Sequence, residues 1–227
     1  MKGKLCGIGV GPGDPDLLTI KAVRILENCD MIAVPGKTPA ETYAFDIALK
    51  AVPDIESKPV IAIDWPMTRD REKLEKIYRN AADAIEKRLE EGSNVAFLTI
   101  GDVAVYSTFN YVAKLVREDG FEVEMVPGIT SFSAVASRLG IALTEHEEML
   151  HVVPAGCKDP EDMPGTRVLM KPGKDLREIK RSIKASGRTA MMVEKCGLPE
   201  EQVYRSVEEM PDEASYLTTV IVFDRKE

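Results

Sequence analysis

The chain has 227 residues, of which 44% are hydrophobic and 30% charged, and its formal net charge at pH 7 is −8. This balance is typical of a globular protein, and no apolar run approaches the roughly 18 residues that predict a transmembrane helix. The acidic charge argues against a nucleic-acid surface, which requires a basic face. Four scattered cysteines and two histidines predict neither a disulfide framework nor a metal site. The chain starts without a signal-peptide pattern, which predicts a cytoplasmic location.

The N-terminal stretch reads as a strand, a glycine-rich turn and a helix. Residues 5–10 are short and apolar and lead into Gly11-Pro12-Gly13. Asp14-Pro15 is typical of a helix start, and the apolar spacing over residues 17–28 predicts that helix. The turn therefore lies at the carboxyl end of a strand, where ligands bind in open α/β sheets.

Two nucleotide-binding patterns fail in this region. A Rossmann pattern that starts at Gly7 requires glycine where this chain has Pro12, a residue without an N–H group. A P-loop that ends at Gly36-Lys37-Thr38 requires glycine at Met31. Taken alone, the glycines of the first turn could also serve only to make a tight turn between strand and helix, with no ligand bound there.

The next elements alternate between strands and helices, which predicts a mostly parallel, doubly wound sheet. Because parallel strands with right-handed crossovers end at one edge, three loops can build one cleft there. Those loops are the first turn, the turn at Gly101-Asp102 and the turn at Pro127-Gly128. The expected strands are 30–34, 59–63, 94–99 and 122–126, and the expected helices are 42–52, 71–91 and one capped by Thr130 or Ser131 that runs to 139.

A polar stretch near residues 144–148 divides the chain into a first domain, 1–144, and a second domain, 145–227. Hairpin-like spacing after this stretch predicts a mixed or antiparallel sheet with one helix on it. The expected strands are 150–154, 167–170, 189–194, 202–207 and 217–224, and the expected helix is 175–184.

Three motifs, in order and at suitable spacing, resemble the tetrapyrrole methylase family over essentially the whole chain. They are Gly7-Ile8-Gly9-Val10-Gly11-Pro12-Gly13-Asp14-Pro15, Gly101-Asp102 with Tyr106-Ser107, and Val126-Pro127-Gly128-Ile129-Thr130-Ser131. Within the family, Pro66-Met67-Thr68 and the blocks 99–109 and 129–132 are most similar to the C20-methyltransferases that act on precorrin-2 or cobalt-factor II in cobalamin synthesis. Val103 stands where the family usually has proline, which leaves an extra N–H group in that loop.

The resemblance implies an S-adenosylmethionine-dependent methyltransferase, with two α/β domains that hold cofactor and substrate in the cleft between them. It also implies a homodimer. The first turn, with Gly11, Gly13 and Asp14, would line the tetrapyrrole side. The residues implied to bind S-adenosylmethionine are Pro12, Ile100, Gly101, Asp102, Val105, Thr130 and Ser131.

Other residues follow from the chemistry of such a reaction. An acidic protein can hold a carboxylate-rich macrocycle only with local cations, which favours Lys37, Arg69, Arg71 and Lys171 on loops. Methyl transfer to a ring carbon releases a proton, and the candidates that accept it or position the ring are Asp102, Tyr106, Lys171 and Tyr216. Equally, Asp102 could only cap a helix, and Lys171 and Tyr216 could be surface residues.

Several other functions remain open from the sequence. A related methylase could act on another tetrapyrrole carbon, on diphthine in a protein, or on ribosomal RNA, although the acidic charge weighs against RNA. A nucleotide sensor would bind the same cofactor without turnover. The sequence does not distinguish a metal-free from a cobalt-loaded substrate.

Overall fold

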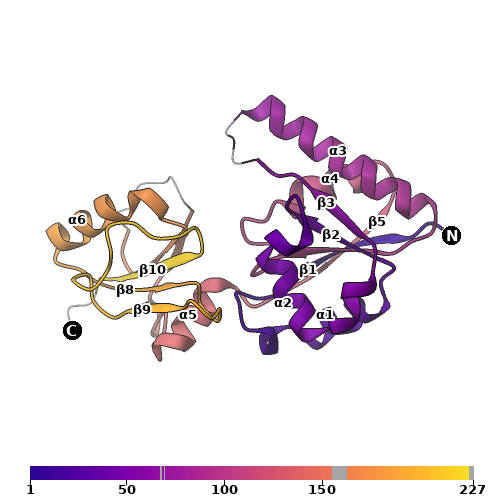
Figure 1. Cartoon of the computed structure of the whole chain (residues 1–227). Coiled ribbons are helices and arrows are strands. Elements are labelled where there is room, and N and C mark those ends of the chain that lie inside the picture. Colours follow the sequence, from indigo (N-terminus) through magenta and orange to yellow (C-terminus); the bar gives the residue numbers. More distant parts are fainter. Residues whose placement is uncertain (67, 69, 155–162, 225–227) are drawn as a thin grey trace. The chain divides into compact units, whose positions relative to one another are not determined.

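The computed structural model describes residues 1–66, 68, 70–154 and 163–224. They form two compact units, Met1–Thr130 and Ser131–Glu227, each built on its own five-stranded sheet (Figure 1). Two α/β units were expected from the sequence, and this fold class is confirmed. Among the helices in the described ranges, none is both long and apolar enough to cross a membrane.

The first unit is a parallel sheet with the order β3-β2-β4-β1-β5. The alternation of strands and helices predicted from the sequence is confirmed, with most bounds shifted by a residue or two. The elements are β1 (Lys4–Gly9), α1 (Ile20–Asn28), β2 (Met31–Pro35), α2 (Tyr43–Ala51), β3 (Val60–Ile63), α3 (Arg71–Glu90), β4 (Val95–Thr99), α4 (Phe109–Glu118) and β5 (Glu122–Val126).

The strand order explains where the helices lie. The chain moves from β1 outward to β2 and β3, then returns to β4 beside β1 and ends at β5. Right-handed crossovers in opposite directions put their helices on opposite faces, and α1 and α2 lie on one face while α3 and α4 lie on the other (Figure 1). The reversal point is between β1 and β4, which is the place where open α/β sheets bind ligands.

The start of the first helix differs from the expectation. Asp14 does not cap α1: its Oδ1 accepts the Asp16 N–H at 2.9 Å and caps a short 3-10 turn, Pro15–Leu17. The helix begins at Ile20, where Thr19 Oγ1 accepts the Ala22 N–H at 3.2 Å. The prediction that Asp14-Pro15 starts the first α-helix is therefore wrong, because proline at a first helical position suits a short 3-10 helix as well as an α-helix.

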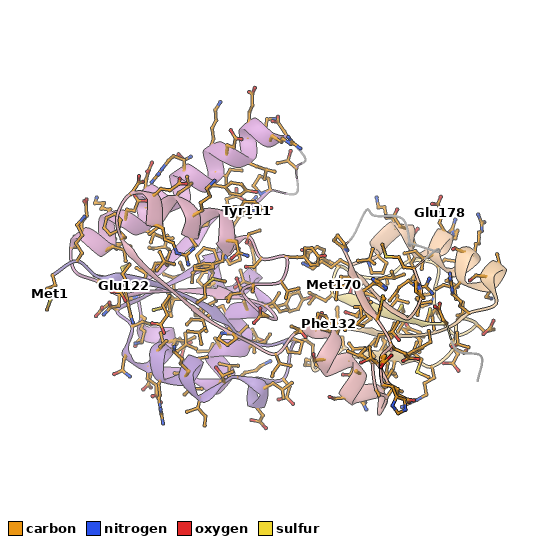
Figure 2. All side chains as sticks on the ribbon, turned by 180° about the vertical axis from the view of Figure 1, so that it is seen from behind. Met1, Tyr111, Glu122, Phe132, Met170 and Glu178 are labelled. Atoms are coloured by element: carbon orange, nitrogen blue, oxygen red, sulfur yellow. The ribbon has the colours of Figure 1, made fainter. Side chains whose placement is uncertain are left out.

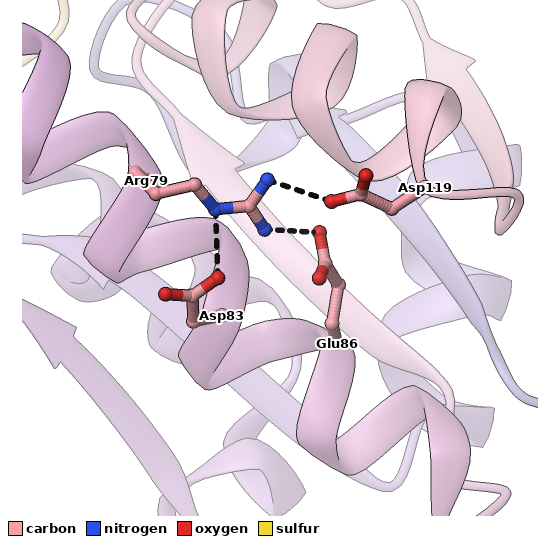
Figure 3. Close-up of polar contacts among 4 residues, drawn as sticks. All are labelled: Arg79, Asp83, Glu86 and Asp119. Atoms are coloured by element: carbon pink, nitrogen blue, oxygen red, sulfur yellow. Dashed lines mark hydrogen bonds and ion pairs between the residues drawn. The ribbon is translucent and has the colours of Figure 1, made fainter.

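The two long helices on the α3–α4 face are joined by an arginine. Arg79 of α3 donates to Asp83 and Glu86 on its own helix, each at 2.7 Å, and to Asp119 after α4 at 2.6 Å (Figure 3). Beneath them, α3 and α4 share one apolar cluster with β1 and β4, which includes Ile85, Phe97 and Val112. The helix pair is therefore held both by packing and by a charged bridge at the end of α4.

The second unit is a mixed sheet with the order β6-β7-β10-β8-β9, in which β6 and β7 are parallel and the other pairs are antiparallel. The expected mixed sheet is confirmed, but two helices, α5 and α6, pack on it where one was expected. The last expected strand before β10 ends at Tyr204 rather than at 207. The elements are α5 (Ser131–Leu139), β6 (Leu150–Val153), β7 (Thr166–Met170), α6 (Leu176–Ser186), β8 (Thr189–Glu194), β9 (Gln202–Tyr204) and β10 (Thr218–Phe223).

The division between the units comes before α5, whereas the sequence placed it after residue 144. The reason is packing: Val135 and Leu139 of α5 share an apolar cluster with Val193 of β8 and Ile221 of β10. Arg138 of α5 also pairs with Glu201 at 2.5 Å. A polar stretch marks an exposed loop, but burial decides to which unit a helix belongs.

We predict an acid-sensitive contribution to stability from Glu124 of β5. Its carboxylate pairs with Lys21 at 2.5 Å and with Lys4 at 2.7 Å, and these contacts lower the pKa of Glu124. A depressed carboxyl pKa stabilises the fold fully above the ordinary value of 4.5 and loses that effect as pH falls through the folded value.

The measurement is the urea midpoint of Glu124→Gln and of the wild type at several pH values. The variant should be less stable near neutral pH, and the difference should shrink as the pH is lowered below 4.5. Glu122→Gln is the control, because Glu122 lies on the same strand and has no ion pair among the described residues. A gap that persists unchanged in acid would contradict the prediction.

Candidate ligand-binding edge

The carboxyl ends of β1 and β4 are joined by backbone hydrogen bonds between two glycines. The Gly11 N–H donates to Gly101 O at 3.2 Å, and the Gly101 N–H donates to Gly11 O at 2.7 Å. Just before them, the Val10 N–H donates to Thr99 O at 2.9 Å. The first turn and the Gly101-Asp102 turn therefore meet at the reversal point of the sheet, as the sequence predicted.

The third loop packs against the same junction. A Cβ atom on Gly9 would lie 2.5 Å from Gly128 N and 2.7 Å from Gly101 O, closer than side-chain atoms approach backbone. Gly101 has a left-handed φ of 74°, and a Cβ there would meet no atom within 4 Å. Three backbones thus touch on one side of the junction, and Gly101 leaves open space on the other for a ligand to approach the chain.

Asp102 holds two of these loops together. Its Oδ1 accepts the Ala104 N–H at 2.8 Å within its own loop, and its Oδ2 accepts the Gly128 N–H at 2.9 Å in the loop after β5. Both carboxylate oxygens therefore have backbone donors. This arrangement favours a role in positioning the loops, and it is not the simple helix cap that the sequence left as an alternative.

The remainder of the β4 loop is fixed by buried hydroxyls and one amide. The buried hydroxyls of Thr99 and Ser107 lie 3.1 Å apart, and Ser107 Oγ accepts the Phe109 N–H that begins α4. Asn110 Nδ2 donates to Val103 O at 3.0 Å, and the Val103 side chain is buried in the core. The loop is thus anchored to its own strand and helix at both ends.

Tyr106 lies at the exposed tip of this loop. It has a left-handed φ of 49°, and its side chain is half exposed. A tyrosine in this conformation costs free energy, and such strain is concentrated at functional sites. The structure therefore keeps Tyr106 as a candidate for positioning a ligand.

The cation-bearing loops follow β2 and β3, on the other side of the reversal point. Lys37 follows β2, and Arg71 is the first residue of α3; both are exposed, and neither has an ion pair among the described residues. The expected Arg69 lies outside the described residues. Gly13 and Pro12 of the first turn are buried, and Asp14 is engaged in the 3-10 turn.

The second unit brings three of the expected residues together around the start of β10. Lys171 Nζ donates to Tyr216 Oη at 2.7 Å, and the Lys171 N–H donates to Thr218 O at 2.9 Å. Thr219 Oγ1 donates to Ser131 Oγ at 3.4 Å. Lys171 also has a left-handed φ of 56°. Tyr216 is 53% exposed, so it lies at the surface as the alternative expected, and there its hydroxyl forms a defined pair with Lys171.

The expected residues thus form two groups, one in each unit. The first-unit group is Gly11, Pro12, Gly13, Asp14, Lys37, Arg71, Ile100, Gly101, Asp102, Val105, Tyr106 and Thr130, and the second-unit group is Ser131, Lys171 and Tyr216. Gly9, Ser107 and Gly128 were part of the sequence motifs but not of the expected site. In the described part of the chain, no three His, Cys, Asp or Glu side chains are placed to hold a metal ion.

These features define a class of protein: an α/β protein with a glycine-lined ligand edge at the reversal point of a parallel sheet. The family model for Tetrapyrrole (Corrin/Porphyrin) Methylases matches residues 4–211. The chain belongs to this family.

Individual members of this family are similar to the chain over most of its length. A cobalt-precorrin-2 C(20)-methyltransferase of Salmonella typhimurium is 31% identical over 98% of this chain and 97% of its own length. A protein of Methanocaldococcus jannaschii, described as a probable cobalt-precorrin-2 C(20)-methyltransferase, is 43% identical over 74% of this chain and 72% of its own. A crystal structure of uroporphyrin-III C-methyl transferase from Thermus thermophilus, complexed with S-adenyl homocysteine, has a TM-score of 0.68 at 21% identity, covers 98% of both chains and so shares the fold.

We predict that Asp102→Asn loosens the link between the loops after β4 and β5. An amide has one acceptor oxygen, so its NH₂ group would face either the Ala104 or the Gly128 N–H, and an unsatisfied donor costs about 1–3 kcal/mol. The melting temperature and the affinity for S-adenosylhomocysteine in calorimetry should both fall.

Asn110→Ala is the matched control for this prediction, since it removes a hydrogen bond within the β4 loop but leaves the link to Gly128 intact. The control should keep the affinity for S-adenosylhomocysteine. If Asp102→Asn keeps wild-type stability and affinity but loses turnover, the carboxylate takes part in the reaction itself and the positioning role is wrong.

Proposed function

We propose that this chain transfers a methyl group from S-adenosylmethionine to C20 of precorrin-2 or its cobalt-loaded form, in cobalamin biosynthesis. The observation that carries the proposal is the three-glycine junction at the reversal point, in a chain whose family and full-length relatives use this chemistry. The alternatives are methylation at another tetrapyrrole carbon and binding of the cofactor without turnover.

The open side of Gly101 supports binding of S-adenosylmethionine. Because Gly101 has no side chain and a left-handed backbone, a ligand can approach its loop closely. Hydrogen bonds of Gly11 and Asp102 hold this loop in place. Thr130 and Ser131 add hydroxyl groups at the start of α5. The bound cofactor supplies an activated methyl group, and the residues of this chain align it, which is the main catalytic lever in an in-line displacement.

The exposed cations after β2 and β3 are the proposed contacts for the carboxylates of the tetrapyrrole. Lys37 and Arg71 can form charge-assisted hydrogen bonds, and arginine can do so with two parallel bonds. Holding the rim of the ring fixes which ring carbon faces the methyl group. Arg69 is proposed for the same role on the sequence alone.

The Lys171–Tyr216 pair is the proposed handler of the proton that leaves the ring carbon. The Tyr216 hydroxyl accepts a hydrogen bond from the Lys171 ammonium, which holds the two polar groups side by side. Asp102 is proposed to position the loops and not to accept the proton, because backbone donors use both of its oxygens. The homodimer and the cytoplasmic location stay predictions from the sequence and the family resemblance.

The proposal is tested by incubating the protein with S-adenosylmethionine labelled at the methyl carbon and with either precorrin-2 or its cobalt-loaded form. Carbon NMR of the product should show one new methyl group, at C20. A methyl group at another carbon would identify a different member of the family. Tight binding of S-adenosylhomocysteine with no product from either ring would support the sensor alternative.

We predict that Arg71→Ala and Lys37→Ala each raise the KM for the tetrapyrrole about three- to fivefold, since an exposed ion pair contributes up to about 1 kcal/mol. The affinity for S-adenosylhomocysteine should not change, and the KM should rise with salt less steeply than in the wild type. Lys87→Ala, which removes an exposed charge at the other end of α3, is the control. Equal effects of Arg71→Ala and Lys87→Ala would show only a general charge effect.

A further inference from the structure

Three aromatic rings from three different elements form a continuous column. Trp65 lies in the loop after β3, Tyr78 lies in α3 and Tyr111 lies in α4. Figure 2 labels Tyr111 in the first unit. The ring centroids of Trp65 and Tyr78 are 5.1 Å apart, and those of Tyr78 and Tyr111 are 4.7 Å apart with the planes only 3° from parallel. Stacked pairs of this kind favour one relative position of the elements that carry them.

The column runs from the core to the surface. Trp65 packs against the apolar cluster beneath α3 and α4, Tyr78 is half-buried, and Tyr111 is 55% exposed. Burial and the neighbouring Tyr111 raise the pKa of Tyr78 above its ordinary value of 10.0. The Tyr111 ring at the exposed end leaves apolar surface in water, and packing of α3 against α4 does not require an exposed ring at this position.

The column lies at the carboxyl edge of the sheet, where the candidate ligand-binding loops are. Tyr111 is in the first turn of α4, directly after the loop that Ser107 anchors, and Tyr78 is two turns into α3. Both helices run from the carboxyl end of one strand of a parallel sheet to the amino end of the next, so α3 and α4 are parallel to each other. The first turns of α3, with Arg71, therefore extend past the start of α4.

We propose that the Trp65–Tyr78–Tyr111 column is a positioning device for methyl transfer. It fixes Trp65 and the Arg71 end of α3, a proposed contact of the tetrapyrrole, relative to the loop after β4, the proposed contact of the methyl donor. The inference rests on the proposed function. Its importance follows from the reaction, because a misplacement of about 1 Å in an in-line displacement can cost about 100-fold in rate.

The helix pair has contacts besides the column. Arg79 links α3 to Asp119 at the end of α4, and the apolar cluster includes residues of both helices. Removing an exposed ring at the edge should therefore change alignment more than folding. Arg79→Gln provides the opposite case, because it weakens the helix pair away from the ligand edge and leaves all three rings in place.

The experiment compares Tyr78→Ala and Tyr111→Ala with Tyr78→Phe, Tyr111→Phe and Arg79→Gln. Each protein is assayed for kcat and for the KM of the tetrapyrrole, for the dissociation constant of S-adenosylhomocysteine, and for melting temperature. The alanine variants should lower kcat/KM about tenfold through both kcat and the tetrapyrrole KM, with cofactor affinity within about twofold of wild type. The phenylalanine variants keep the stack and should keep the activity.

Arg79→Gln should lower the melting temperature while kcat/KM stays within about twofold of wild type. Tyr111→Leu is the further variant if Tyr78→Ala does not fold, since it keeps apolar bulk at an exposed position and removes only the stacking. It should lower kcat/KM like Tyr111→Ala. If the ring variants lower melting temperature alone, or if Arg79→Gln lowers kcat/KM as much as they do, the column is ordinary packing and the inference is wrong.

Trp65 is the only tryptophan of the chain and gives an independent readout. Its fluorescence in the wild type should change when the tetrapyrrole is added and not with S-adenosylhomocysteine alone. An unchanged signal in a wild-type protein that methylates the ring would overturn the inference and leave the proposed function standing. A wild-type protein that methylates no tetrapyrrole would overturn the proposed function itself.

Discussion

The close approach of three backbones at Gly9, Gly101 and Gly128 is the constraint on which the first unit depends. No side chain fits between them, so the loops after β1, β4 and β5 are held by main-chain hydrogen bonds and by one carboxylate. A junction of this kind is stiff, because its contacts involve few rotatable bonds. It also depends on strand order, since β4, β1 and β5 are neighbours and their loops can reach one another.

The same strand order separates two kinds of chemistry along one edge. The glycine loops follow β4, β1 and β5, while the exposed cations and the aromatic column follow β2, β3 and the helices beside them. A methyl donor needs close backbone contact, and a carboxylate-rich ring needs charges at its rim. Neighbouring positions on one parallel sheet can therefore supply both.

The sequence predicted the alternation of elements and the meeting of the three loops, because parallel strands leave little freedom in where their ends lie. The sequence did not show which structural role each glycine of the first motif has. Gly7, Gly9 and Gly11 look equivalent in sequence, yet a Cβ on Gly7 would strike the Phe109 ring, one on Gly9 would strike the backbone of Gly128, and Gly11 pairs with Gly101. These roles depend on strand order and on distant packing. The pairing of Lys171 with Tyr216 was hidden for the same reason, since β7 and β10 are far apart in sequence.

The way this chain uses its polar groups agrees with a reaction that is limited by alignment. A methyl cation equivalent passes to a carbon, so the step needs no strong base before the new bond forms, and the positive charge of the sulfonium is lost. The carboxylate of Asp102 accordingly binds two backbone N–H groups, and the hydroxyls of Thr99 and Ser107 bond to each other beneath the loop. Tyr106 and Lys171 are two of four non-glycine residues in the described part of the chain with a left-handed backbone conformation; the other two are His146 and Lys195. In the first unit, the loop that carries Tyr106 starts at the glycine junction, whose main-chain hydrogen bonds fix where this loop leaves the sheet. The proposed aromatic column between α3 and α4 would meet the same requirement for fixed geometry.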